Sequence, residues 1–135
     1  TSTEGLVKFA EIANSDNGYS YGATFVLMND IDLSSIDNWT PIGNNNRTFE
    51  GSFYGNGHTI SNMKISSESD YVGLFGYCVS QKNAMISDIV LKDVDITAKG
   101  RYIITCHIRS DCNYFRSIII IRNFYCLFCR YPYCR

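Results

Sequence analysis

The sequence predicts an all-β fold, a right-handed parallel β-helix formed by a partial stack of coils with a short N-terminal capping helix. First, short β-rich pieces alternate with glycine-bearing turns throughout residues 29–77. Second, an apolar-x-x-apolar-x-apolar pattern at residues 60–65 occurs again at 86–91, an offset of 26 residues. Repeats of about this length indicate stacked structural units. Third, the two-residue alternation slips once in each copy, as expected where a chain turns a corner between strands.

A short amphipathic helix is expected over residues 4–14. Thr3 precedes it as a candidate N-cap. The apolar residues at helical spacing are Leu6, Phe9, Ala10 and Ala13. Such a helix would cover the open strand edges at one end of the coil stack. A cluster of turn-forming residues at 16–18 separates the helix from the strands.

The first strand is expected over residues 24–33. In it Ile31 and Leu33 alternate with Asp30 and Asp32. Because neighbouring side chains of a strand point to opposite faces, the apolar pair should face the interior and the two acids the solvent.

The rest of the glycine-rich run is expected to form short strands separated by tight bends. Glycine takes positive φ without a Cβ penalty and lets neighbouring backbones approach closely. The residues assigned to this structural motif are Gly43, Gly51, Gly55, Gly57, Gly73, Leu74, Phe75 and Gly76. A polar loop is expected at residues 44–46, and Asn56 between two glycines indicates a turn.

Three segments are expected along the chain: the helix and turn at residues 1–19, the coils at 20–100, and an atypical tail at 101–135. The tail is rich in Cys, Ile and Arg, whereas all 10 glycines precede it. It contains no Ala, Val, Glu or Lys, and its only acid is Asp111. Most of the depleted residue types have codons beginning with G, so we predict a frameshifted, non-native tail. A genuine Cys-rich appendage is the alternative, and the flanking nucleotide sequence would distinguish the two.

The chain is also expected to be a fragment of a longer protein. It starts at Thr1 without a methionine and has no leader of charged then apolar residues. No run of about 18 apolar residues occurs that could span a bilayer. We therefore expect no membrane span in this fragment.

Five short sequence elements follow one another in fixed order: residues 30–33, 39–43, 49–53, 55–62 and 73–76. Together they resemble the GLUG-motif family of bacterial cell-surface and secreted proteins, over residues 4–98. The resemblance implies a pectin-lyase-like parallel β-helix, as in adhesin-like proteins and some immunoglobulin A peptidases. The sequence departs from the family at Tyr54, where the motif often has an acid, and the resemblance stops at Gly100.

Two acids are candidate ligand-binding residues, Asp30 and Asp32. With Asp37 and Glu50 nearby in the sequence, they could supply paired carboxylates or oxygen ligands for Ca²⁺. Their spacing lacks the ligand density and loop glycine of an EF-hand, and the alternative is that they are solvated residues on a strand surface. We assign no catalytic residue, and His58 is interpreted as a turn histidine whose ring hydrogen-bonds the coil.

Two aromatic residues, Trp39 and Tyr54, are the other candidate ligand-binding residues. Aromatic ring faces can stack on the apolar surfaces of sugars. Trp39 can equally fill a corner of the core, as Phe49 and Phe53 would. Tyr54 follows the inward Phe53 in a strand and should therefore point outward.

No metal and no cofactor is assigned. Five of the six cysteines lie in the atypical tail, where His107 and the CxxC pair Cys126 and Cys129 resemble zinc ligands. Disulfides would fit an exported protein, but the sequence leaves their connectivity open. The basic and aromatic residues of the tail resemble a nucleic-acid patch, yet we expect no nucleic-acid partner.

These observations predict a non-catalytic structural or adhesive module of a bacterial extracellular or cell-surface protein. Its partner would be a host surface glycan or a protein. One alternative is a carbohydrate-active enzyme with Asp30, Asp32 or Glu50 as its acids. Another is an accessory domain of a surface peptidase whose catalytic motif lies outside this chain. An enzyme is the less favoured hypothesis because the sequence contains no convergent catalytic set.

Overall fold

The computed structural model describes residues 2–15, 19–69, 71–79 and 83–98, with only the backbone of Tyr71, Val72 and Ala98. It also describes the backbone of five strands between residues 102 and 126. The first elements are α1 (Thr3–Ser15), β1 (Thr24–Val26), β2 (Ile31–Asp32), β3 (Ser52–Tyr54), β4 (Thr59–Ser61) and β5 (Lys64–Ser67). They are followed by β6 (Tyr71–Gly73), β7 (Tyr77–Cys78), β8 (Ile86–Ser87), β9 (Val90–Lys92) and β10 (Asp95–Ala98). The five later strands are β11 (Tyr102–Ile104), β12 (His107–Ile108), β13 (Phe115–Arg116), β14 (Ile119–Ile121) and β15 (Tyr125–Cys126).

Helix α1 confirms the helix expected near the N-terminus. The apolar residues predicted to form one face are all buried: Leu6, Phe9, Ala10 and Ala13. The predicted N-cap is wrong, because it is Ser2 whose Oγ accepts a hydrogen bond from the Gly5 N–H at 3.0 Å. Thr3 instead donates its hydroxyl to the carbonyl oxygen of Asp32 at 2.9 Å, which ties the start of α1 to β2.

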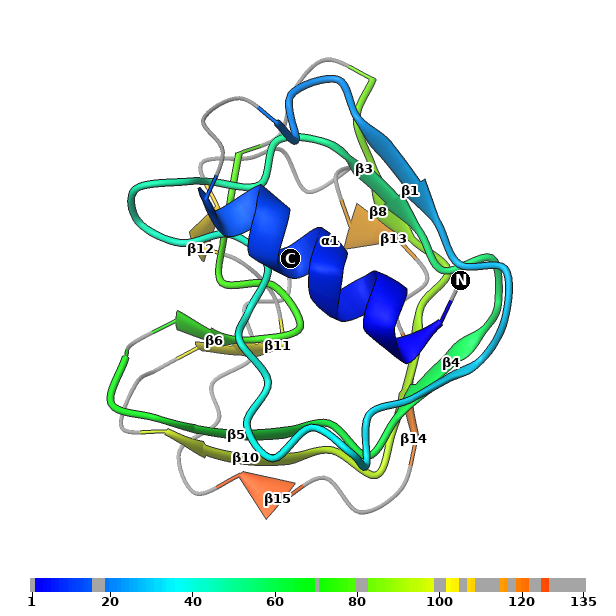
Figure 1. Ribbon diagram of the computed structural model, residues 1–135, viewed down its shortest axis with the longest axis vertical. Helices are drawn as coiled ribbons and strands as arrows, with labels where there is room; N and C mark the ends of the chain where they lie inside the picture. Colours follow the sequence, from blue (N-terminus) through cyan, green and yellow to red (C-terminus); the bar gives the residue numbers. More distant parts are fainter. Residues whose placement is uncertain are drawn as a thin grey trace.

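All the strand pairs are parallel. The sheet orders are β1-β3-β8-β13, β14-β9-β4-β2, β15-β10-β5, β11-β6 and β12-β7. In Figure 1 these sheets lie around α1, which crosses the middle of the view. Each pass of the chain therefore contributes a short strand to several different sheets.

Apolar side chains from successive passes stack upon one another to form the core. Ile31 pairs with Ile60, and Ile60 with Leu91. All three side chains are at most 2% exposed. Helix α1 packs Phe9 onto this interior, with its ring centroid 4.4 Å from that of Phe25 and 6.3 Å from that of Phe53. The helix thus buries its apolar face against the first strands of the stack.

The predicted right-handed parallel β-helix is wrong. Before residue 99 the paired strands fall into separate sheets of two or three, and the later strands extend two of these to four. The strands are only two to four residues long, so backbone pairing is interrupted at each bend. The small sheets do not close into one continuous coil. The spacing of the apolar repeat indicated that these segments pair with one another. Pairing of strands does not by itself require that the sheets close into a coil.

The predicted 26-residue repeat is also wrong as a structural register. Ile86 pairs with Phe53, whereas Ile60 pairs with Leu91, 31 residues later. Likewise Ile65 pairs with Ile96. The apolar pattern of residues 60–65 occurs at 91–96 as well as at 86–91, so the pattern fits both registers. The pairing of Ile60 with Leu91 and of Ile65 with Ile96 selects residues 91–96.

The corners expected within the two copies are present. Asn62 lies between β4 and β5 with φ of 59°, and Asp88 lies between β8 and β9 with φ of 56°. A further bend at Asp93, between β9 and β10 with φ of 52°, lies 31 positions after Asn62, as the paired strands on either side do. Asn and Asp tolerate the left-handed region better than other non-glycine residues, which explains their place at these bends.

Two glycines of the structural motif show why no side chain is accommodated there. A Cβ on Gly55 would lie 2.2 Å from the carbonyl oxygen of Asp88. Gly43 has φ of 87°, and a Cβ there would lie 2.2 Å from the carbonyl oxygen of Tyr77. Leu74 and Phe75 are each 1% exposed and belong to the core.

Other local expectations have mixed outcomes. The strand predicted over 24–33 is divided into β1 and β2, but Ile31 and Leu33 are buried while Asp30 and Asp32 are exposed, as predicted. The loop expected at 44–46 is confirmed by a turn in which Asn44 and Arg47 exchange backbone hydrogen bonds of 2.9 and 3.1 Å. The turn expected at 16–18 lies outside the described residues.

Candidate functional site

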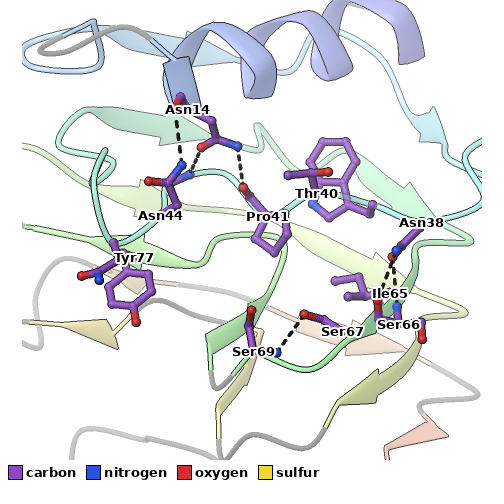
Figure 2. A pocket seen from close by; sticks show the side chains of 13 residues that line it. Asn14, Asn38, Thr40, Pro41, Asn44, Ile65, Ser66, Ser67, Ser69 and Tyr77 are labelled. Atoms are coloured by element: carbon purple, nitrogen blue, oxygen red, sulfur yellow. Dashed lines mark hydrogen bonds between the residues drawn. The ribbon is translucent and has the colours of Figure 1, made fainter.

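The candidate site is a pocket of about 480 Å³ next to the C-terminal end of α1. Its walls come from that end of the helix, from residues 38–45, from β5 and the residues after it, and from Tyr77. Figure 2 shows Pro41 and Thr40 on the segment between Asn14 and the serines of β5. Of the four predicted ligand-binding residues, only Trp39 is among the described residues that line this pocket.

Asn14 holds the helix end against one wall of the pocket. Its Nδ2 donates to the carbonyl oxygen of Pro41 at 2.9 Å, and its Oδ1 accepts from the Gly43 N–H at 2.7 Å. Asn44 extends the cluster by donating its Nδ2 to the Asn14 carbonyl oxygen at 3.4 Å. Because both ends of the Asn14 amide are bonded to backbone, this wall has one defined position (Figure 2).

Asn38 holds the opposite wall. Its Nδ2 donates to the Ser66 carbonyl oxygen at 3.1 Å, and its Oδ1 accepts from the Ser66 N–H at 3.0 Å. The side-chain amide thus pairs with the backbone of β5 as a neighbouring strand residue would. This contact continues the parallel pairing where the chain between β2 and β3 has no strand of its own.

Trp39 directly follows Asn38 in the same segment and is 2% exposed. Its indole Nε1 donates to the Leu74 carbonyl oxygen at 3.2 Å, and its backbone N–H donates to the Lys64 carbonyl oxygen at 2.7 Å. The residue is therefore mainly part of the core, as the alternative interpretation held, and reaches the pocket with only a small part of its surface. Trp39 therefore does not form an exposed aromatic platform for a sugar ring.

Asp30 lies outside the pocket, on the solvent side of β2. Its Oδ1 accepts a hydrogen bond from the Thr59 N–H at 2.9 Å and lies 3.1 Å from His58 Nδ1. The backbone hydrogen bond from Thr59, followed by the contact with His58, lowers the pKa of Asp30 below its ordinary value of 3.8. The interpretation of His58 as a turn histidine with a hydrogen-bonded ring is confirmed.

Asp32 has its own, separate set of partners. Its Oδ1 accepts from Asn62 Nδ2 and from the Ser34 N–H, both at 2.9 Å. The amide of Asn62, then the backbone of Ser34, lowers the pKa of Asp32 below 3.8. Asp30 and Asp32 therefore each stabilise the bend of the next pass of the chain, and within the described residues no hydrogen bond joins the two carboxylates.

The two remaining candidates lie elsewhere. Tyr54 is half-buried at the end of β3, between Val26 and Ser87 of the neighbouring strands. Glu50 is half-buried as well, and its Oε1 accepts a hydrogen bond from the Thr48 hydroxyl at 3.1 Å. The pocket therefore uses residues that the sequence did not single out, Asn14 and Asn38 above all. Two sequence features could have indicated these residues: Asn14 stands at the end of the expected helix, and Asn38 is next to the tryptophan.

The described part of the chain contains no arrangement of side chains that matches the metal-binding hypotheses. Among those residues no group of three or more His, Cys, Asp or Glu is placed to hold a metal ion. The tail residues with zinc-like spacing are His107, Cys126 and Cys129, and their side chains are not among those that the structure describes. Cys78 is 1% exposed and disulfide-bonded.

No family model and no solved structure matches the chain. A protein of Evansella cellulosilytica with the provisional name Gly-rich membrane protein is 35% identical over 97 residues, which cover 67% of this chain. The alignment spans only 11% of the length of that protein. Within the residues described here, α1 is not a helix of the length and apolar character needed to cross a membrane.

Proposed function

We propose that this chain is a non-catalytic structural or adhesive module of a longer bacterial protein of the cell surface or extracellular space. The observation that carries the proposal is the use of the glycine-rich run for packing and bends. Ile31, Ile60 and Phe53 are buried between passes of the chain, and Gly43 and Gly55 allow backbones to touch. Residues used in this way stabilise the fold and do not form a reaction centre, which supports a structural role.

The arrangement of the carboxylates supports the same proposal. A sugar-cleaving site of the common type needs two carboxyl groups that face one bond from a separation of roughly 5–10 Å. Here each of the two outward acids is directed to its own neighbours, Asp30 to Thr59 and His58, and Asp32 to Asn62 and Ser34. Both are exposed on the surface of the strands and do not line the pocket.

The resemblance to the GLUG-motif family and the relative in Evansella cellulosilytica add support of a weaker kind. The relative is named a membrane protein, and this chain corresponds to a small share of it. A module of a large envelope-associated protein is consistent with both likenesses. The partner we propose is a surface glycan or a protein of a host.

A polysaccharide-degradation assay combined with an adhesion assay tests the proposed function. Beads coated with the chain should adhere to glycan-bearing cells, and no new reducing or unsaturated ends should appear in polysaccharide incubated with the chain. Asp30→Asn and its control Asp37→Asn, another exposed acid, should both leave adhesion unchanged. New chain ends that disappear with Asp30→Asn but persist with Asp37→Asn would contradict the proposal.

That last result would support the carbohydrate-active enzyme instead. The observation that favours this second function is the 3.1 Å contact between the Asp30 carboxylate and the half-buried His58 ring. A carboxylate that orients an imidazole is a recurrent element of acid–base catalysis.

A further inference from the structure

We propose that the pocket beside the C-terminal end of α1 binds an uncharged saccharide. The proposal rests on the adhesive function proposed above and deepens it, because it assigns that function a site and a class of ligand. With a volume of about 480 Å³ the pocket falls in the range of small-molecule sites.

The described lining of the pocket carries no formal charge. None of the residues in it is Asp, Glu, Lys, Arg or His. Hydroxyl and amide groups provide its polar surface. A site without a formal charge offers nothing to offset the desolvation of an ionised ligand, whereas it can replace the hydration of neutral hydroxyl groups.

The lining also has an apolar part. The half-buried Pro41 and Tyr77 present carbon surface within the same pocket, and the buried Trp39 and Ile65 add only a small area. Sugar rings combine C–H faces with a rim of hydroxyl groups, and such ligands need apolar surface beside hydrogen-bonding groups. Burial of apolar area against these side chains would provide part of the affinity.

Polar groups at the pocket remain available for a ligand. The hydroxyl of Thr40 and the amide of Asn45 are exposed and make no hydrogen bond to the described part of the chain. Ser67 Oγ accepts a hydrogen bond from the Ser69 N–H at 3.1 Å, which leaves its own proton to donate. These three groups can bond to ligand hydroxyls without breaking an existing contact.

The walls of the pocket are preorganised. The amides of Asn14 and Asn38 hold two walls through hydrogen bonds to backbone atoms. A ligand would therefore meet walls that are already ordered, and little conformational entropy would be lost on binding.

Titration of the full 135-residue chain with defined oligosaccharides tests the proposal. The probes are neutral gluco-, manno- and galacto-oligosaccharides and, as charged counterparts, oligogalacturonates. Trp39 is the only tryptophan of the chain and lines the pocket, so its fluorescence reports on this site, with calorimetry as the second measurement. At least one neutral series should change the emission of Trp39 and bind more tightly than the oligogalacturonates.

The double variant Thr40→Val, Asn45→Ala should weaken that binding about tenfold, because two hydrogen bonds to the ligand are lost. The matched control is Thr24→Val, Asn46→Ala, which changes an exposed threonine and the neighbouring loop asparagine outside the pocket. It should bind as the unchanged chain does. Circular dichroism establishes that all three proteins are folded alike.

Three results would overturn the saccharide site: no neutral oligosaccharide binds the folded chain, oligogalacturonates bind more tightly, or both double variants are affected equally. Adhesion of coated beads separates this failure from failure of the proposed function. If beads adhere and the pocket variant adheres normally, the adhesive function stands and the pocket proposal is wrong. If beads carrying the folded chain do not adhere at all, the adhesive function itself fails, and with it the pocket proposal that rests on it.

Discussion

The interior and the outer surface of the stacked strands both join residues about 30 positions apart, but they do so with different chemistry. Inside, Phe53 stacks on Phe25, 28 positions earlier, with ring centroids 4.9 Å apart. Outside, Asp32 binds Asn62 through a hydrogen bond of 2.9 Å. The same spacing along the chain thus produces dry aromatic contacts on one side and solvated polar contacts on the other.

The interior and the outer surface therefore contribute differently to the fold. Burial of an aromatic side chain contributes several kcal/mol. A hydrogen bond at an exposed surface contributes far less, because water competes for the same groups. The interior therefore provides stability. The hydrogen bonds of the polar surface determine which bends form and which segments lie side by side.

Phe53→Ala should cause the largest loss. The side chain is 0% exposed and contacts aromatic rings of α1, β1 and the segment after β6. Its removal should lower the free energy of unfolding by about 3–5 kcal/mol. Urea denaturation followed by circular dichroism measures this. The control is Tyr21→Ala, at 65% exposure, which should change little; equal effects of the two variants would contradict the division between interior and surface.

Gly55→Ala should destabilise more than Gly57→Ala. The new Cβ at Gly55 would be 2.2 Å from a backbone oxygen, so the strands must separate, at a cost of about 1–3 kcal/mol or more. At Gly57 nothing lies within 4 Å, and only its φ of 75° is unfavourable, at about 1–2 kcal/mol. Thermal denaturation of both variants compares close packing with backbone strain. A larger effect at Gly57 would mean that the tight approach at Gly55 does not constrain the fold.

Asn14→Ala should have an intermediate effect. The substitution removes the bonds to the Pro41 carbonyl and the Gly43 N–H, which lie at the border between core and surface. We expect a loss of about 1–2 kcal/mol in the free energy of unfolding. Hydrogen exchange at the Gly43 amide should accelerate at the same time. Asn46→Ala is the control, and unchanged exchange at Gly43 in the Asn14 variant would contradict the anchoring role.

The smallest effect is expected from the outer carboxylates, as a pH dependence. The pKa values of Asp30 and Asp32 are lowered in the folded chain relative to 3.8, so the unfolded state binds more protons between the folded and unfolded values. The stability they contribute is present above about pH 3.8 and is lost as the pH falls through the lowered pKa values. The variant Asp30→Asn, Asp32→Asn should show a flatter decline of stability on acidification. Asp37→Asn should keep the original decline, and an unchanged slope in the double variant would refute the assignment.

The prediction of local features succeeded where neighbouring residues alone decide them. Leu6 and Phe9 are buried on one face of a helix because their spacing matches its period. The bend at Asn62 was visible as a slip in alternation, since a corner changes which residues point inward. The pocket was not predicted, because Asn14 and Asn38 acquire their partners, Pro41, Gly43 and Ser66, from segments 27 to 29 residues away.

The apolar face of α1, the inward and outward residues around β2, and the loop at Asn44 were predictable without coordinates. Periodicity and turn chemistry act over a few residues, and the sequence shows them directly. The pairing of Ile60 with Leu91 rather than with Ile86, and the small separate sheets in place of a closed coil, follow only from contacts in the folded chain. Register and closure depend on which distant side chains pack together, and the apolar pattern of residues 60–65 fits more than one partner.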